Sequence, residues 1–179
     1  MANAANEEAK RFSMECIETA LLSLMREKAY DKITYHEIAQ HAGVSRNAIY
    51  RNFTSADDIL DQYFRSKTEE FLKSATQTDN YRTYLLAVFR HLETMKEDTS
   101  LMLKAGKEQV IYNAFLLLRN HYATPDEQIR EYYDYYRIGG IYSVYLHWVE
   151  NGCRETPEEL CEIVFQVMRV YGIVPNGNH

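Results

Sequence analysis

Residues that interrupt regular structure are scarce in this chain. Its 179 residues include only 7 glycines and 3 prolines, too few for the many tight turns of a sheet-rich protein. This scarcity favours long helices. Hydrophobic residues make up 46% of the sequence, which is enough to build a buried core in one domain or in a small domain joined to a larger one.

The chain also lacks the features of secreted and membrane proteins. Its cysteines, Cys16, Cys153 and Cys161, form no closely spaced pair, so we expect reduced thiols that pack as small hydrophobic side chains. No stretch approaches the roughly eighteen apolar residues of a membrane span. The first residues contain no apolar core of signal-peptide length. These absences predict a cytoplasmic protein with no membrane partner.

A surplus of positive charge is missing as well. The formal net charge of −6 argues against a general polyanion-binding protein. Between Arg26 and Thr54, however, five basic residues stand against three acidic ones. Any binding of nucleic acid must therefore depend on this local excess of positive charge.

Signatures of catalysis are not evident either. The sequence has no Gly-rich phosphate loop and no nucleophile elbow. His147 and Glu150 have a spacing at which both could bind one metal ion, but no third ligand is apparent. We therefore expect no catalytic residues, no metal site and no cofactor.

Apolar residues recur at helical spacing through most of the chain. Ile17, Ala20, Leu21 and Leu24 follow the i, i+3, i+4, i+7 pattern that predicts the buried stripe of a helix. No segment has the pattern of a credible strand. The sequence predicts an all-α fold of about nine helices, at residues 7–28, 34–42, 45–53, 55–76, 80–96, 100–105, 108–121, 125–151 and 157–171.

The second and third predicted helices carry clear end signals. Thr34 and Glu37 have the spacing of a capping box, in which each side chain accepts the backbone amide of the other residue. Gly43 suits the positive φ of a helix C-terminus, and Ser45 suits an N-cap. Two short helices joined by a tight turn are therefore expected between Thr34 and Phe53.

The third predicted helix has two unlike faces. Ile49 and Phe53 lie four residues apart and face inward, whereas Arg46, Asn47 and Tyr50 lie on the opposite side. A short helix with a cationic, amide and phenolic outer face suits the major groove of DNA. A polar face of a helix that is merely exposed to solvent is the alternative.

The stretch from Ile33 to Leu60 resembles the DNA-binding signature of the TetR/AcrR family of bacterial regulators. The shared residues are the helix cap, the turn, the apolar pairs and the start of the next helix: Thr34, Ile38-Ala39, Ala42-Gly43-Val44-Ser45, Ile49-Tyr50, Phe53 and Asp58-Ile59-Leu60. The resemblance implies a three-helix helix-turn-helix domain at residues 1–54. It implies a helical regulatory and dimerisation domain at residues 55–179.

The resemblance also implies roles for individual residues. The Tyr50 hydroxyl would contact a phosphate, and Tyr35 and His36 would contact the DNA backbone or bases. Arg46 could pair with guanine and Asn47 with adenine. The predicted DNA-binding residues are Thr34, Tyr35, His36, Ser45, Arg46, Asn47, Ala48, Tyr50 and Asn52.

One position departs from the family pattern. Where the family commonly opens the fourth helix with a lysine that anchors a phosphate, this chain has Ala56. That contact is therefore lost. The helix N-terminus can still direct backbone amides at a phosphate, but the charges of Asp57 and Asp58 oppose this attraction.

The last two predicted helices resemble the C-terminal region of a TetR subgroup, in which they pair with their counterparts in a second subunit. Gly139, Gly140 and Ser143 form a patch of small residues that permits close approach of helices. An ordinary pair of core helices within one chain is the alternative. The predicted homodimer interface comprises Gly139, Gly140, Ser143, Val144, Trp148, Leu160, Val164, Val167 and Met168.

The family resemblance further implies a pocket for a small-molecule inducer among the middle helices. The predicted lining residues are Tyr84, Phe89, Met102, Phe115, Tyr133 and Tyr136, although an aromatic residue or Met at helical spacing is more often a core residue. Inducer binding would favour a dimer that no longer fits its palindromic operator, and the repressor would leave the DNA. Control by a protein partner, or a helical interaction module without DNA binding, is the alternative.

Overall fold

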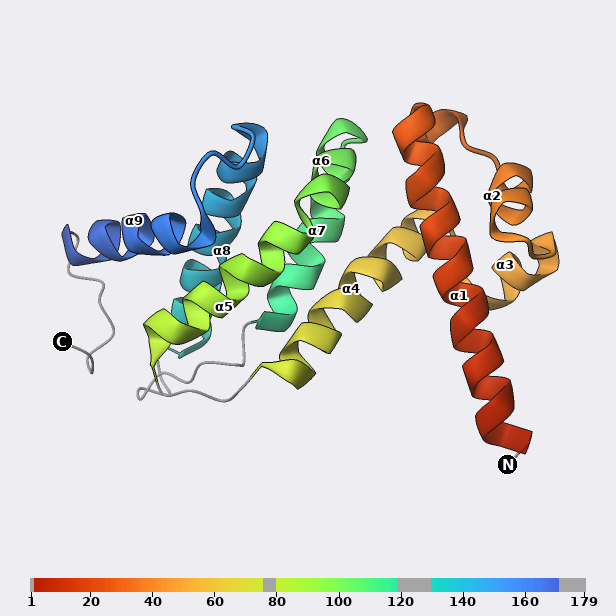
Figure 1. Cartoon of the computed structure of the whole chain (residues 1–179), viewed down its shortest axis with the longest axis horizontal. Coiled ribbons are helices and arrows are strands. Elements are labelled where there is room, and N and C mark those ends of the chain that lie inside the picture. Colours follow the sequence, from red (N-terminus) through yellow and green to blue (C-terminus); the bar gives the residue numbers. More distant parts are fainter. Residues whose placement is uncertain (1, 76–79, 119–129, 171–179) are drawn as a thin grey trace. The chain divides into compact units, whose positions relative to one another are not determined.

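The computed structural model describes residues 2–75, 80–118 and 130–170, and these residues are folded almost entirely into helices (Figure 1). The predicted all-α fold is confirmed, and no strand occurs in the described ranges. The elements are α1 (Ala2–Glu27), a 3-10 turn η1 (Tyr30–Lys32), α2 (Tyr35–Ala42), α3 (Arg46–Asn52), α4 (Ala56–Ser74), α5 (Tyr81–Thr94), α6 (Lys96–Lys104), α7 (Glu108–Leu116), α8 (Arg130–Glu150) and α9 (Pro157–Val170).

The chain divides into two compact units, and each unit is made of two separate stretches of the sequence. The first contains residues 1–67 and 101–114, and the second contains residues 68–100 and 115–179. The second half of α6 and most of α7 thus belong with the N-terminal helices. None of the described helices is long and apolar enough to cross a membrane.

In the first unit, α2 and α3 pack against one side of α1 (Figure 1). The predicted stripe of α1 is buried, with Ile17 and Leu21 fully inaccessible. Opposite them lie Ile38 of α2 and Ile49 of α3, which are also fully buried. This apolar cluster fixes α3 by its inner face and leaves its polar face outward.

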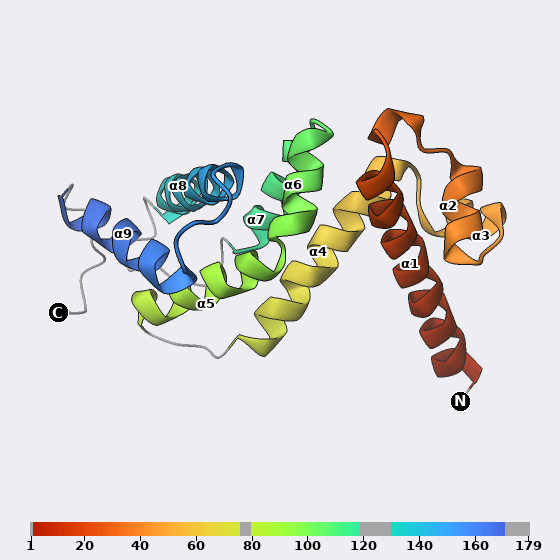
Figure 2. The same cartoon turned by 45° about the horizontal axis from the view of Figure 1, so that its top comes forward.

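In the second unit, α5 packs along α9 (Figure 2). Two ion pairs join the helices, Arg82 with Glu162 and Arg90 with Glu158, each at 2.7 Å. The buried hydroxyl of Tyr145 in α8 donates to the Leu92 carbonyl at 3.0 Å and lies 2.8 Å from the Thr99 hydroxyl. These bonds satisfy polar groups in an interior of aromatic and aliphatic side chains.

One predicted helix boundary is wrong. The sequence placed residues 80–96 in one helix and began the next at residue 100, whereas α5 ends at Thr94 and α6 already begins at Lys96. The chain turns at Met95, a buried apolar residue with no glycine or proline beside it. The predicted ends at residues 76, 121 and 171, and the start at residue 125, lie outside the described residues.

Candidate nucleic-acid interface

Local hydrogen bonds hold the start of α2. The Thr34 hydroxyl accepts the Glu37 amide at 3.3 Å, and the Glu37 carboxylate accepts the Thr34 amide at 2.9 Å, so the predicted capping box is confirmed. Lys28, just beyond α1, forms an ion pair with the same carboxylate. The hydrogen bond from Lys28, followed by those from Thr34, lowers the pKa of Glu37 to about 2.

The turn between α2 and α3 has the predicted backbone. Gly43 adopts the left-handed conformation with φ of 66°, where a side chain would strain the backbone. The Val44 amide returns to the Ala39 carbonyl at 3.0 Å. The Ser45 hydroxyl then caps α3 by accepting the Ala48 amide at 3.2 Å. These contacts set the angle at which α3 leaves α2.

The outer face of α3 is polar and open. Arg46, Asn47 and Tyr50 are exposed, with 60% of Tyr50 accessible. The ring of Tyr35, in the first turn of α2, lies 5.3 Å from the ring of Tyr50. His36 is exposed beside it. Two helices therefore expose several of the residues predicted to contact DNA, and they bring the rings of Tyr35 and Tyr50 together.

Four of the predicted DNA-binding residues have other positions or tasks in the structure. Ala48 is 6% exposed and faces the core, because it lies next to Ile49 on the inner side of α3. The Asn52 side chain donates to the Ala48 carbonyl at 2.8 Å. Thr34 and Ser45 serve as the helix caps described above. The exposed reading surface is thus narrower than the predicted set of residues.

The acidic start of α4 is already engaged by neighbouring groups. Asp58 accepts a hydrogen bond from the Thr54 amide at 2.7 Å. Asp57 accepts hydrogen bonds from Lys107 Nζ at 2.8 Å and from the Tyr30 hydroxyl. Lys107 lies 50 residues after Asp57 and was not singled out from the sequence. Nothing in the local sequence of Lys107 indicates this contact, because it depends on the tertiary packing of the α6–α7 turn.

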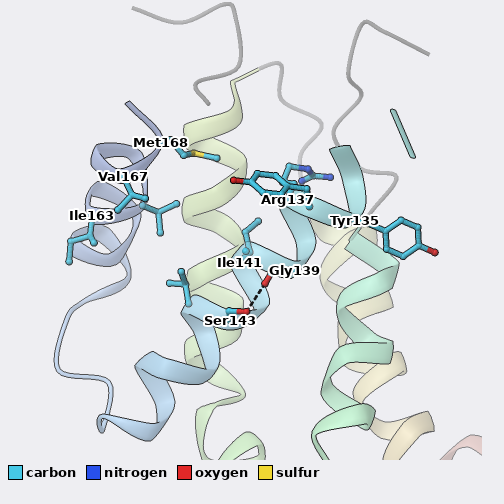
Figure 3. A pocket seen from close by; sticks show the side chains of 12 residues that line it. Tyr135, Arg137, Gly139, Ile141, Ser143, Ile163, Val167 and Met168 are labelled. Atoms are coloured by element: carbon cyan, nitrogen blue, oxygen red, sulfur yellow. Dashed lines mark hydrogen bonds between the residues drawn. The ribbon is translucent and has the colours of Figure 1, made fainter. Parts of the chain in front are cut away.

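A second candidate surface is an apolar groove between α8 and α9, with a volume of about 550 Å³ (Figure 3). Seven of the predicted interface residues line it: Gly139, Gly140, Ser143, Val144, Val164, Val167 and Met168. The Ser143 hydroxyl donates to the Gly139 carbonyl at 2.9 Å, so the only polar side chain among these seven is satisfied within α8. The groove presents mainly aliphatic side chains.

Two of the predicted interface residues lie elsewhere. Trp148 is 2% exposed and its indole N–H donates to the Glu155 carbonyl at 3.0 Å. Leu160 is also buried. Both side chains fill the interior of the chain, because the helices turn them away from the groove. Their assignment to an exposed interface is therefore not supported.

The residues predicted to line an inducer pocket are mostly packed in the interior. Tyr84, Phe89, Met102 and Phe115 are buried, and the Tyr84 hydroxyl donates to the Leu118 carbonyl at 3.3 Å. Tyr133 and Tyr136 are more accessible, and Tyr136 lines the α8–α9 groove. The described residues contain no cluster of three or more His, Cys, Asp or Glu side chains placed to hold a metal ion.

Comparison with known proteins decides the family. The family described as "Bacterial regulatory proteins, tetR family" matches residues 17–63, and the family described as "Transcriptional regulator C-terminal region" matches residues 79–170, more than half of the chain. The chain belongs to the TetR family of transcriptional regulators. The resemblance of residues 33–60 to the DNA-binding signature of this TetR family is therefore confirmed at the family level.

One curated relative matches most of the chain. The chain is 22% identical over 172 residues to the uncharacterized HTH-type transcriptional regulator YxbF of Bacillus subtilis; the match includes 85% of this chain but 43% of that protein. This TetR-family chain thus spans less than half the length of that relative.

The structural neighbours share the fold. The dihydroxyacetone kinase operon activator DhaS has a TM-score of 0.62 at 16% identity, over 89% of this chain and 95% of DhaS. A TetR-family regulator from Streptomyces coelicolor has a TM-score of 0.62 at 18% identity, over 89% and 96% of the two chains. FadR of Bacillus subtilis, in complex with stearoyl-CoA, has a TM-score of 0.52 at 18% identity, over 92% and 99%.

Proposed function

We propose that this TetR-family regulator is a dimeric repressor whose two α3 helices read the half-sites of a palindromic operator. The exposed face of Arg46, Asn47 and Tyr50 carries this proposal. The chemistry of these side chains suits the major groove, where Arg pairs with guanine and Asn with adenine. The Tyr50 phenol can donate a hydrogen bond to a phosphate of the DNA backbone. Tyr35 supports the same surface from α2.

The apolar groove between α8 and α9 supports the dimer. Side chains such as Ile163 and Val167 are 45% and 51% exposed in the single chain. Burial of such a groove against the same helices of a second subunit would remove this apolar surface from water. Gly139 and Gly140 would allow the two subunits to approach closely.

Regulation by a small molecule is the proposed control. FadR, a structural neighbour, is in complex with stearoyl-CoA, which illustrates that this fold can accept a ligand. A ligand would release the operator only if it bound the dimer that fits the operator less tightly than the dimer that does not. A protein effector is the second candidate, because Tyr84, Phe89 and Phe115 fill the interior and leave less room for a ligand.

A mobility-shift titration tests the proposal. The wild-type protein is titrated against the DNA that flanks its own gene, at low salt and with unrelated DNA as competitor. We expect a discrete complex that survives the competitor, and we expect Arg46→Ala to weaken that complex while binding to the competitor changes little. No complex at low salt would contradict DNA reading by α3.

A further inference from the structure

We propose that Lys107, in the turn between α6 and α7, is a positioning residue for DNA binding that neutralises Asp57 at the start of α4. The inference rests on the proposed reading of DNA by α3. It assigns a role in the DNA-binding unit to a residue that lies far from the helix-turn-helix in sequence. Three contacts carry it.

Two of the three contacts reach the Asp57 carboxylate, and the third joins the two groups that bind it. Lys107 Nζ lies 2.8 Å from Asp57 Oδ2, and the Tyr30 hydroxyl donates to Asp57 Oδ1. Lys107 Nζ also lies 4.9 Å from the centre of the Tyr30 ring, within the range of a cation–π contact. One carboxylate oxygen of Asp57 therefore binds an ammonium group and the other binds a phenol. The ammonium group of Lys107 contacts both the Asp57 carboxylate and the Tyr30 ring.

The ion pair belongs to the DNA-binding unit. Residues 101–114 group with residues 1–67, so the α6–α7 turn packs with α1–α4. Asn113 of α7 adds a second contact by donating to Asp61 of α4 at 3.1 Å. The side chain of Lys107 is 26% exposed, whereas that of Asp57 is 51% exposed. The lysine is thus held by the fold beside a carboxylate that is half exposed to solvent.

Asp57 needs a counter-charge because of where it lies. It occupies the first turn of α4, five residues after the last residue of α3. Helix N-termini attract phosphates, and an ionised carboxylate in the first turn opposes that attraction. Burial alone would raise the pKa of Asp57, but the bonds from Lys107 and Tyr30 outweigh it and lower the pKa, so the carboxylate stays ionised. Lys107 then cancels a charge that protonation does not remove.

The neighbouring Asp58 does not need a positively charged partner in the same way. Asp58 accepts the Thr54 amide at 2.7 Å and the Thr54 hydroxyl at 3.0 Å, and it accepts the Gln62 side chain at 3.0 Å. These neutral donors spread its charge over the cap of α4. Asp57 is the acid of this turn that the structure pairs with a full positive charge.

A mechanical role for the same contact makes a different prediction. If Lys107 served only to tie the α6–α7 turn to α4, removal of either partner would break the tie and both variants would bind DNA poorly. If Lys107 acts through charge, loss of the lysine weakens binding, whereas loss of the carboxylate does not. The double variant separates these two cases.

The experiment measures affinity for a duplex that the wild-type protein selects from random DNA. The proteins are wild type, Lys107→Met, Asp57→Asn and the double variant, each checked by thermal unfolding for a folded state. We expect Lys107→Met to weaken binding about fivefold at low salt, and less at higher salt, since an exposed negative charge is left near the phosphates. Asp57→Asn should bind DNA at least as tightly as wild type. Added to Lys107→Met, it should restore the DNA affinity that the lysine variant has lost.

Two controls make the result specific. Lys107→Arg keeps the charge and should bind like wild type. Lys104→Met removes an exposed lysine at the end of α6 and changes the net charge equally, and it should leave binding within about twofold of wild type. Equal losses for Lys107→Met, Asp57→Asn and the double variant, or an equal loss for Lys104→Met, would overturn the inference. A wild-type protein that selects no DNA sequence would instead overturn the proposed function together with it.

Discussion

At the scale of single residues, the proposed DNA contacts differ in how firmly the fold holds them. The Tyr50 ring lies against the Tyr35 ring, so its exposed hydroxyl is presented from a supported position. The Asn52 amide already donates to the Ala48 carbonyl. A supported ring loses less conformational freedom on binding than a mobile side chain, which favours Tyr50 as an anchor.

The Tyr50 hydroxyl can be tested by itself. Tyr50→Phe keeps the ring contact with Tyr35 and removes a phosphate bond, so affinity should fall by about 1 kcal/mol per subunit. Because phosphates carry no sequence information, operator and random duplexes should lose affinity alike in an anisotropy titration. A changed preference between the two duplexes would count against a phosphate contact. Tyr132→Phe, at an exposed tyrosine of α8, is the matched control.

Glu18 gives a prediction about pH. Its side chain is 7% exposed in α1, and burial raises its pKa from the ordinary 4.5 to about 7, although Lys67 lowers it in part and Glu15 raises it. Between these two values the folded state holds a proton that the unfolded state has released. Stability therefore falls as the pH rises from 4.5 to about 7.

Replacement of Glu18 by Gln should remove this fall in stability with rising pH. In urea unfolding, Glu18→Gln should be more stable than wild type by on the order of 2 kcal/mol at about pH 8, and the difference should shrink toward pH 4.5. Glu8→Gln, at an exposed position of α1, is the control and should show little change with pH. An advantage of Glu18→Gln that is independent of pH would contradict the assignment.

At the scale of elements, the α2–turn–α3 segment depends on the backbone of Gly43. A Cβ atom at Gly43 or at Gly140 would meet no heavy atom within 4 Å, but only Gly43 has a positive φ, of 66°. The two positions therefore separate backbone strain from crowding. This distinction matters because the turn sets the direction of α3.

Alanine at the two glycines should have opposite effects on stability. Gly43→Ala should cost about 1–2 kcal/mol through the left-handed backbone. Gly140 also belongs to the proposed dimer interface, so this control is measured in the Val167→Glu background, which is expected to be a single chain. There Gly140→Ala should be neutral or stabilise the helix by up to about 1 kcal/mol. Chemical unfolding of both variants measures the difference. Equal effects at the two sites would mean that strain at Gly43 does not determine the stability of the turn.

The elements also show which predictions the sequence could support. The capping box of Thr34, the positive φ of Gly43 and the cap of Ser45 are made by neighbours in the chain, so their residue types predicted them correctly. The α5–α6 boundary at Met95 has no such local signal, and neither does the contact of Lys107 with Asp57. Both depend on tertiary packing, which residue spacing along one helix does not encode.

The face of a helix was harder to assign than its existence. Periodicity placed Trp148 and Leu160 on the same two helices as the residues that line the groove, but it did not decide between the interior and an intersubunit surface. Both environments are apolar, so hydrophobic spacing cannot separate them. The structure resolves the choice because Trp148 bonds the Glu155 carbonyl of its own chain.

At the scale of the whole molecule, the proposed dimer depends on the α8–α9 groove. Val167 and Val170 are both exposed on α9, at 51% and 79%, but only Val167 lines the groove. Val167→Glu would place an unpaired carboxylate in the apolar interface, at a cost of several kcal/mol. Val170→Glu adds the same charge outside the groove.

Light scattering on a sizing column checks this prediction. Wild type and Val170→Glu should elute with the mass of a dimer, and Val167→Glu should elute with the mass of a single chain while its helical circular dichroism is retained. A dimer that persists in Val167→Glu would place the interface elsewhere. A single-chain mass for the wild-type protein at micromolar concentration would argue against the dimer itself.

The most direct measurement of the central claim is a selection from random double-stranded DNA, run in parallel with wild type and Arg46→Ala. We expect wild type to enrich an inverted repeat with two half-sites, one for each α3. We expect Arg46→Ala to enrich the same repeat with discrimination relaxed at one base pair in each half-site. No enriched sequence for wild type, or an unchanged sequence for Arg46→Ala, would contradict the reading of DNA by the exposed face of α3.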